Sequence, residues 1–227
     1  MKNKILYADP KYRELLKSFT VTDSIVALLY YVLILAVYYL MGLALSRTGK
    51  YYGYAVNIIL MLIPIFICRR LSSLGISKRN LKKSLIVSGL IGLLFLLSMT
   101  IIPGIIMKAE FLPVGDILNN IFYYLIIIAL SEEISFRGYI QPRLYPLVKN
   151  ECLMIIIGGI LFVFMHYPFQ MSMRGMSFLE YWPQFISAAP FQFLWHLAFS
   201  ELYRLFGNIF GSTLLHGLVD LSTGIFK

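Results

Sequence analysis

Long apolar stretches separated by short polar connections run through most of the chain. Membrane spans are expected at about residues 24–45, 52–68, 84–107, 117–140, 153–167, 184–203 and 208–225. A helix of roughly 20 apolar residues crosses a bilayer, and most stretches approach that length, although the last four are short, polar or interrupted by Gly and Pro. The pattern therefore predicts an all-α fold, a polytopic membrane helix bundle of about seven transmembrane helices.

A shorter amphipathic stretch precedes the first span. After Asp9-Pro10, apolar and basic residues alternate at helical spacing; they are Tyr12, Leu15, Leu16 and Phe19, with Lys11, Arg13 and Lys17 between them. This pattern is typical of a helix that lies on an anionic membrane surface. We therefore expect an N-terminal interfacial helix. The first apolar run, Ile25 to Leu45, is too long for the apolar core of a signal peptide and predicts a true span.

Composition supports a membrane protein and excludes a soluble domain. Of the 227 residues, 59% are hydrophobic, and the mean hydropathy is +0.77. Soluble domains contain about 45–50% apolar residues. No internal repeat or low-complexity segment divides the chain, so we expect a single membrane domain over residues 1–227. The two cysteines, Cys68 and Cys152, have no motif spacing and are expected to be reduced.

The net charge of +9 follows the expected membrane topology. With the N-terminus inside, the inside connections hold fifteen Lys and Arg residues and the outside connections hold five, in agreement with the positive-inside rule. We therefore expect a multi-pass cell-membrane protein with a cytoplasmic N-terminus and a site that is reached from the inside. The basic residues are not interleaved with aromatic residues that could stack on bases, so nucleic acid is not an expected partner.

Three ionisable residues lie at the end of the apolar run in the fourth span. Glu132, Glu133 and Arg137 each cost roughly 2.5–3.5 kcal/mol at the centre of a membrane helix, and less near an interface. Glu133 and Arg137 are four residues apart on one helix face, which predicts a structural ion pair. Glu132 points about 100° away and is free to act as a base or a ligand. The alternative is that all three are solvated charges in the headgroup region.

Two later spans contribute histidines. His166 ends the fifth span, where a lone histidine is more often a satisfied core residue than a catalyst. His216 and Asp220 share one face of the last span, either as part of a site or as a structural pair that satisfies itself. His196, in the sixth span, lies outside these clusters, and we expect it to be structural.

Helix geometry predicts that these clusters meet. The fourth and fifth spans form a hairpin, and the midpoint between Glu132 and His166 falls at the polar pair Lys149-Asn150, so the two side chains reach a similar depth. His216 also lies within the membrane. Four titratable groups from three helices, in so apolar a chain, indicate a functional site. Gly158-Gly159 predicts a close helix approach beside it.

The three clusters resemble the motifs of the CAAX protease and bacteriocin-processing (CPBP, or Abi) family of intramembrane endopeptidases. This family includes the type II CAAX prenyl endopeptidase, the Ras-converting enzyme. The matching motifs are Glu132-Glu133-Ile-Ser-Phe-Arg137 followed by Gly138-Tyr139-Ile140-Gln141, then Phe162 to His166, and then His216 to Asp220. The resemblance covers roughly residues 117–224, the expected catalytic core. It implies an endopeptidase, surrounded by membrane lipid, that cuts a membrane-associated protein or peptide, lipidated or not.

The resemblance assigns a role to each matching residue. Glu132 matches the catalytic glutamate, which activates a water together with the histidine at His166. Glu133 and Arg137 match the pair that supports this glutamate.

The last motif departs from one branch of the family. His216 and Asp220 match the pair that binds the oxyanion, but the prenyl-protease branch has Asn where this chain has Asp220. An ionised Asp would repel an oxyanion. Either Asp220 is protonated, or it orients His216 by accepting its ring proton, as a triad Asp does, and we favour the second option.

Metal dependence and one alternative function remain open at the level of sequence. Glu132, His166 and His216 are plausible ligands for a zinc ion that keeps one position for water. The same residues can activate water without an ion, and we favour hydrolysis that requires no cofactor. The alternative function is a non-catalytic membrane scaffold or a bacteriocin-immunity protein that keeps the fold. A proton-coupled carrier would show a repeat between the two halves, and the sequence has none.

Overall fold

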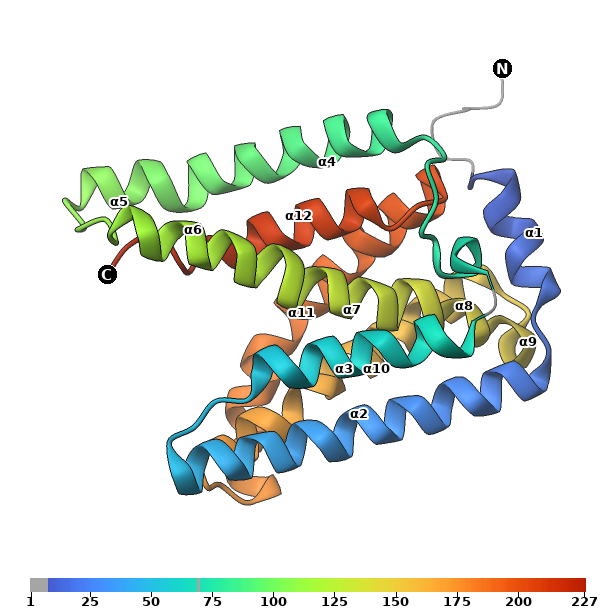
Figure 1. The fold of residues 1–227 in the computed structure, drawn as a ribbon, viewed down its shortest axis with the longest axis horizontal. Coiled ribbons are helices and arrows are strands. Elements are labelled where there is room, and N and C mark those ends of the chain that lie inside the picture. The colour runs from blue at the N-terminus through green and yellow to red at the C-terminus, as the bar shows by residue number, and fades with distance from the viewer. Residues whose placement is uncertain (1–7, 69) are drawn as a thin grey trace.

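Helices make up the fold of the computed structural model, which describes residues 8–68 and 70–227 (Figure 1). The elements of the first half are α1 Pro10–Ser18, α2 Val21–Thr48, α3 Gly53–Ile67, the short 3₁₀-helix η2 Leu71–Leu74, α4 Leu81–Leu96, the π-helical η3 Leu97–Ile101 and α5 Ile102–Ile106. The second half contains α6 Val114–Phe122, η4 Tyr123–Leu130, α7 Ser131–Glu133, η5 Ile134–Ile140, α8 Gln141–Arg143, α9 Tyr145–Val148, α10 Glu151–Met173, α11 Phe178–Phe206 and α12 Phe210–Leu221. The predicted all-α fold is confirmed.

Several of these elements join into rods that can cross a bilayer. Four rods in the described part of the chain have the required length and hydropathy: Val21–Thr48, Leu81–Ile106, Val114–Val148 and Glu151–Met173. α3 is a shorter apolar helix. The predicted multi-pass membrane protein is therefore confirmed, whereas the number of about seven spans stays a prediction.

The last two predicted spans have different bounds in the structure. α11 is 29 residues long and passes through Pro183 and Pro190, so it exceeds the predicted 184–203 at both ends. Neighbouring helices allow a membrane helix to tolerate such prolines. α12 is only 12 residues long and ends at Leu221, so the apolar pattern up to residue 225 includes a turn as well as a helix.

The outer faces of the rods expose large apolar side chains. Phe66, Leu90, Leu94 and Leu194 are between 63% and 81% exposed. Exposed apolar surface of this extent is unfavourable in water and is typical of a surface that contacts lipid.

The rods run between two ends of the bundle, which lie at the right and the left of Figure 1. The right end, called here the N-terminal end, holds α1, the connection from α3 to α4, the connection from α9 to α10 and the turn between α11 and α12. The left end, called here the C-terminal end, holds the connections from α2 to α3, from α5 to α6 and from α10 to α11, and the C-terminus, where Phe226 forms an isolated bridge with Phe111. Each end therefore corresponds to one membrane surface.

The amphipathic helix α1 lies where the sequence predicts it, but protein covers part of its apolar face. Tyr12 and Leu16 are each 2% exposed, and the ring of Tyr12 meets the ring of Tyr203 edge-on at 5.2 Å. Asp9 caps the helix and pairs with the Nε atom of Arg79 at 2.5 Å. The helix is thus docked on the bundle, and its interfacial position stays a prediction.

Candidate active site

One cavity brings together the candidate catalytic residues. It has a volume of about 590 Å³ and is lined from the central and C-terminal parts of the bundle. Glu132, His166, His216 and Asp220 all line it. Residues of three separate helices, far apart in the chain, thus share one cavity, as the hairpin geometry predicts for Glu132 and His166.

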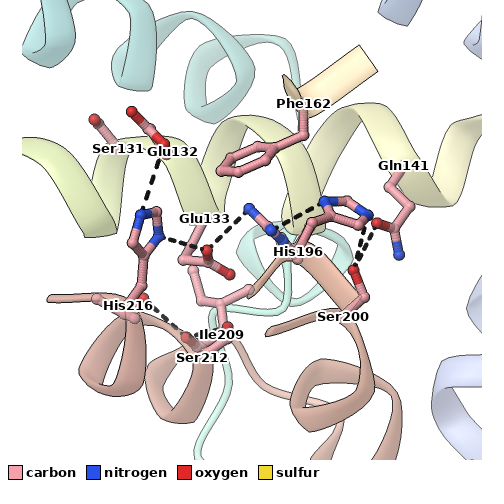
Figure 2. Close-up of polar contacts among 12 residues, drawn as sticks. Ser131, Glu132, Glu133, Gln141, Phe162, His196, Ser200, Ile209, Ser212 and His216 are labelled. Carbon is pink, nitrogen blue, oxygen red and sulfur yellow. Dashed lines mark hydrogen bonds and ion pairs between the residues drawn. The ribbon is translucent and has the colours of Figure 1, made fainter. Parts of the chain in front are cut away.

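Glu132 lies in α7 with its carboxylate toward this cavity. The residue is 7% exposed, and its Oε2 atom lies 3.8 Å from the Nε2 atom of His216 (Figure 2). Among the described residues, Oε2 has no hydrogen-bond partner. The π-helical segments η4 and η5 flank α7, and widened turns of this kind occur often at functional sites.

Glu133 and Arg137 form the ion pair that their spacing predicts, behind the wall of the cavity. Glu133 Oε1 lies 3.0 Å from Arg137 Nη1, and neither side chain is exposed. The guanidinium group lies over the ring of Phe162, with its carbon 4.3 Å from the ring centroid. The pair is therefore shielded from water and packed against an aromatic face, which favours a buried cation.

A chain of hydrogen bonds extends this pair toward the N-terminal end (Figure 2). Arg137 Nη2 lies 3.0 Å from His196 Nδ1, His196 Nε2 lies 3.2 Å from the Ser200 hydroxyl, and that hydroxyl donates to Gln141 Oε1 at 2.9 Å. We call Glu133, Arg137, His196, Ser200 and Gln141 the sealed network, because each side chain is 0% exposed.

The sealed network fixes the protonation of His196. An arginine only donates hydrogen bonds, so His196 Nδ1 must accept and the ring hydrogen must lie on Nε2. That hydrogen is directed to the carbonyl oxygen of Ile155, 3.2 Å away, and to Ser200. A second ring proton would face the guanidinium of Arg137. His196 is therefore a structural histidine, in agreement with the sequence.

Glycine allows the helices around this network to approach. A Cβ atom on Gly159 would lie 2.5 Å from the ring of Phe193 and 3.0 Å from that of His196. The close helix approach predicted at Gly158-Gly159 is present, and it holds α10 against α11.

His216 connects the sealed network to the cavity. Its Nδ1 atom lies 2.9 Å from Glu133 Oε1, its Nε2 atom lies 3.4 Å from Asp220 Oδ2, and its ring stacks on Phe199 at 4.5 Å. Because a carboxylate only accepts hydrogen bonds, Nδ1 carries a hydrogen. The carboxylate that orients the ring through Nδ1 is thus Glu133, whereas Asp220 faces Nε2, since it lies one turn further along α12.

His166 presents one free nitrogen to the cavity. Its Nδ1 atom lies 2.9 Å from the carbonyl oxygen of Phe162, one helical turn earlier. A carbonyl oxygen can only accept, so the hydrogen lies on Nδ1, and in the neutral ring Nε2 keeps its lone pair. This nitrogen is suited to accept a proton or a hydrogen bond from water.

The zinc hypothesis has suitable donor types but no suitable arrangement. Glu132, His166 and His216 are chemically appropriate ligands. Within residues 8–68 and 70–227, however, no three His, Cys, Asp or Glu side chains are close enough to hold one ion. Metal dependence stays a prediction.

The first half of the chain contributes cavity residues that the sequence analysis missed. Tyr38 of α2 and Asn57 of α3 line the cavity, and the Tyr38 hydroxyl donates to Asn57 Oδ1 at 2.9 Å. Asn57 is 2% exposed. A signal was present, because Asn57 is the one strongly polar side chain in the sequence of α3, GYAVNIILMLIPIFI.

Comparison with known protein families points to the segment that carries these candidate catalytic residues. Residues 114–222 match the family model described as type II CAAX prenyl endopeptidase Rce1-like. No curated protein and no solved structure matches the chain. The matched range contains all the residues that carry the sequence resemblance, from Glu132 to Asp220. This segment of the chain is therefore similar to the Rce1-like family of type II CAAX prenyl endopeptidases.

Proposed function

We propose that this protein is an intramembrane endopeptidase that hydrolyses a peptide bond of a membrane-associated protein or peptide. The family supports a peptidase in general terms. The observation that carries the proposal is the shared cavity, in which Glu132, His166, His216 and Asp220 meet although the chain around them is apolar. Buried ionisable groups are costly in a membrane protein, so their presence indicates a function.

In the first step, Glu132 acts as the general base. Its unpaired Oε2 takes a proton from a water molecule, while His166 Nε2 accepts the second hydrogen bond of that water and orients it. The water oxygen bonds to the carbonyl carbon of the scissile peptide, and the electron pair of the C=O bond moves to oxygen. General-base catalysis of this kind contributes about 10²–10⁴ in rate.

His216 and Glu132 serve the second half of the reaction. When both ring nitrogens of His216 are protonated, Nδ1–H is held by Glu133 and Nε2–H donates to the oxyanion. Before substrate arrives, Nε2 faces Asp220 Oδ2 at 3.4 Å, and the two groups pair when His216 is protonated. The C–N bond then breaks, and the leaving amine takes the proton that Glu132 received, which restores the carboxylate.

Cleavage assays with the full chain in detergent test this proposal. The probe is a mixture of synthetic apolar peptides, with and without a prenylated cysteine, incubated in heavy-oxygen water so that each new C-terminus is marked for mass spectrometry. We expect cleavage by the wild type and a loss of about 10²–10⁴ with Glu132→Gln. Glu14→Gln is the matched control, because Glu14 is exposed on α1.

Two results would contradict the proposal. Equal cleavage by the wild type and Glu132→Gln would remove Glu132 from the chemistry. In the second result, the wild type cleaves none of the peptides, while cells that carry Glu132→Gln or His166→Gln keep the phenotype of cells with the wild-type protein. That result would instead support the scaffold or immunity function. Metal analysis of the same samples, with cleavage measured before and after chelation, tests the zinc hypothesis separately.

A further inference from the structure

The cavity and the basic connections lie at opposite ends of the bundle. We infer that the site opens on the extracytoplasmic face of the membrane and takes a neutral or positively charged peptide segment presented there. This inference rests on the proposed peptidase function. It also separates two expectations from sequence, because a cytoplasmic N-terminus and access to the site from the cytoplasm cannot both hold in this structure.

Helix directions show where the cavity opens. Its outer lining includes Tyr51, before α3, Gln170, three residues before the end of α10, and Thr223, just beyond α12. All three positions belong to the C-terminal end of the bundle (Figure 1). Tyr51 is 40% exposed, whereas Glu132 and His216 are 7% and 5% exposed. Exposure thus falls from the C-terminal end toward the catalytic groups.

The opposite route is closed by packed side chains. Between Glu132 and the N-terminal end lie the sealed network and the largest fully buried side chains of that region, which include Phe136, Tyr139, Ile140 and Tyr203, each at most 1% exposed. A packed interior of this density leaves no passage for a peptide. Substrate therefore reaches Glu132 from the C-terminal end.

The distribution of basic residues orients the bundle. In the described chain, the N-terminal end carries eleven Lys and Arg residues, namely Lys11, Arg13, Lys17, Arg70, Lys78, Arg79, Lys82, Lys83, Arg143, Lys149 and Arg204. The C-terminal end carries five, Arg47, Lys50, Lys108, Arg174 and Lys227. Lys2, Lys4 and Arg69 lie outside the described residues. By the positive-inside rule, the N-terminal end is cytoplasmic, and the end that holds the cavity mouth faces outward.

The charge of the lining selects the substrate. Glu132 and Asp220 line the cavity, and no Lys or Arg of the described chain does. Apart from the two histidines, the remaining lining is aromatic, aliphatic or neutral polar, as at Tyr123, Val219 and Gln192. Two carboxylates without a lining Lys or Arg favour a neutral or basic segment and disfavour a free C-terminal carboxylate close to the cut. An internal bond of an apolar or basic peptide fits this cavity.

Thiol labelling in intact cells tests the direction of opening without any need for activity. Cys152 is exposed at the N-terminal end, so in the wild type a membrane-impermeant maleimide should label it only after permeabilisation. The variant Thr223→Cys/Cys152→Ser adds a thiol at the cavity mouth, which should be labelled in intact cells. Thr48→Cys/Cys152→Ser, at the same end but outside the cavity lining, is the matched control. Labelling of Cys152 in intact cells, with protection of the thiol at 223, would overturn the inference.

Proteoliposomes separate this inference from the proposed function. The fraction of molecules with Cys152 hidden inside is measured by labelling, and peptide probes carrying one Lys or one Asp beside the same apolar sequence are added outside. We expect cleavage to rise in proportion to the hidden fraction and to be faster for the Lys peptide. If detergent-solubilised protein cleaves but only molecules with Cys152 outside act on added peptide, the inference fails and the peptidase function stands. If detergent-solubilised protein cleaves nothing, the peptidase function and the substrate class fail, while the labelling still decides the direction of opening.

Discussion

Glu132 and Glu133 are neighbours in the chain, yet they lie in opposite environments. Glu132 faces the cavity, and its Oε2 has no hydrogen-bond partner among the described residues. Glu133 points the other way, where one oxygen accepts from both Arg137 and His216. The rotation of about 100° between successive helical residues is enough to separate these environments. One turn of helix thus supplies both a reactive carboxylate and its support.

The comparison shows why the chain keeps so many ionisable groups in an apolar bundle. In the sealed network, Arg137 compensates the charge of Glu133, and His196 is locked as a neutral acceptor. On the cavity side, Glu132 and Asp220 both lie near one nitrogen of His216, so a proton must be shared among them. The buried ion pair fixes the positions of Glu133 and Arg137. Glu132 and Asp220 are not neutralised by an arginine or lysine in this way and remain available for proton transfer.

Glu132→Gln should cause the largest change in activity and almost none in stability. The neutral amide keeps the size of the side chain but cannot take a proton from water, so the rate should fall by about 10²–10⁴. Only the long 3.8 Å contact with His216 Nε2 is weakened, and the buried Glu133–Arg137 pair stays intact. Cleavage rate and thermal unfolding in detergent, measured on the same preparation, check this. A large loss of stability would contradict this and show that Glu132 has a structural role like that of the sealed network.

Arg137→Met should produce the reverse pattern, a large loss of stability. Removing one member of a buried pair leaves Glu133 uncompensated and costs about 3–5 kcal/mol. Glu133→Gln/Arg137→Met removes both charges, and we expect it to recover part of that loss. Denaturant unfolding of wild type, both single variants and the double variant forms the cycle. Additive single effects would show that the two charges do not interact.

Two histidines provide a matched pair for the next comparison. His166→Gln removes the free ring nitrogen in the cavity, so we expect a loss of about 10² in rate with unchanged unfolding. His196→Gln disturbs the acceptor of Arg137 and should cost about 1–3 kcal/mol of stability, with catalysis largely kept in the folded fraction. Active-site titration corrects the rates for unfolded protein. If both variants lose activity alike, the division of roles between the cavity and the sealed network is wrong.

Local sequence patterns predicted the parts of the site that depend on one helix or one hairpin. The spacing of Glu133 and Arg137 gave their ion pair, and the symmetry about Lys149-Asn150 gave the common depth of Glu132 and His166. Both follow from helical repeat and connectivity, which the sequence contains directly.

Contacts between distant helices were beyond such patterns. Asn57 reaches the cavity only because α3 packs beside α7 (Figure 1), and no spacing within either helix encodes that neighbour. Tyr181 is likewise only 7% exposed because its ring packs against that of Tyr167, with 5.2 Å between the ring centroids. The side on which the cavity opens likewise required the relative positions of all the helices.

Asp220→Asn should have a smaller effect than the variants above. The amide oxygen of Asn can still accept from His216 Nε2, so the loss should stay within about tenfold, the value of one hydrogen bond. Asp220→Leu removes the acceptor and should lose more. Comparison of kcat for the two variants separates a positional role from a need for negative charge. A complete loss with Asn would show that the charge itself is required.

Asn57→Leu should have the smallest effect, and it tests whether the first half of the chain supports Glu132. Asn57 and Glu132 both line the main cavity and a small adjoining one of about 10 Å³. Because the Tyr38 hydroxyl donates to Asn57 Oδ1, that bond leaves the amide nitrogen of Asn57 available, and we expect it to donate to the Glu132 carboxylate directly or through one water. Loss of this donor should lower kcat by a few-fold and leave KM unchanged, since it positions Glu132 and does not contact the peptide. Tyr38→Phe removes only the hydrogen bond to Asn57 Oδ1 and should have a still smaller effect on kcat. A change in KM alone would instead make Asn57 part of the peptide-binding surface.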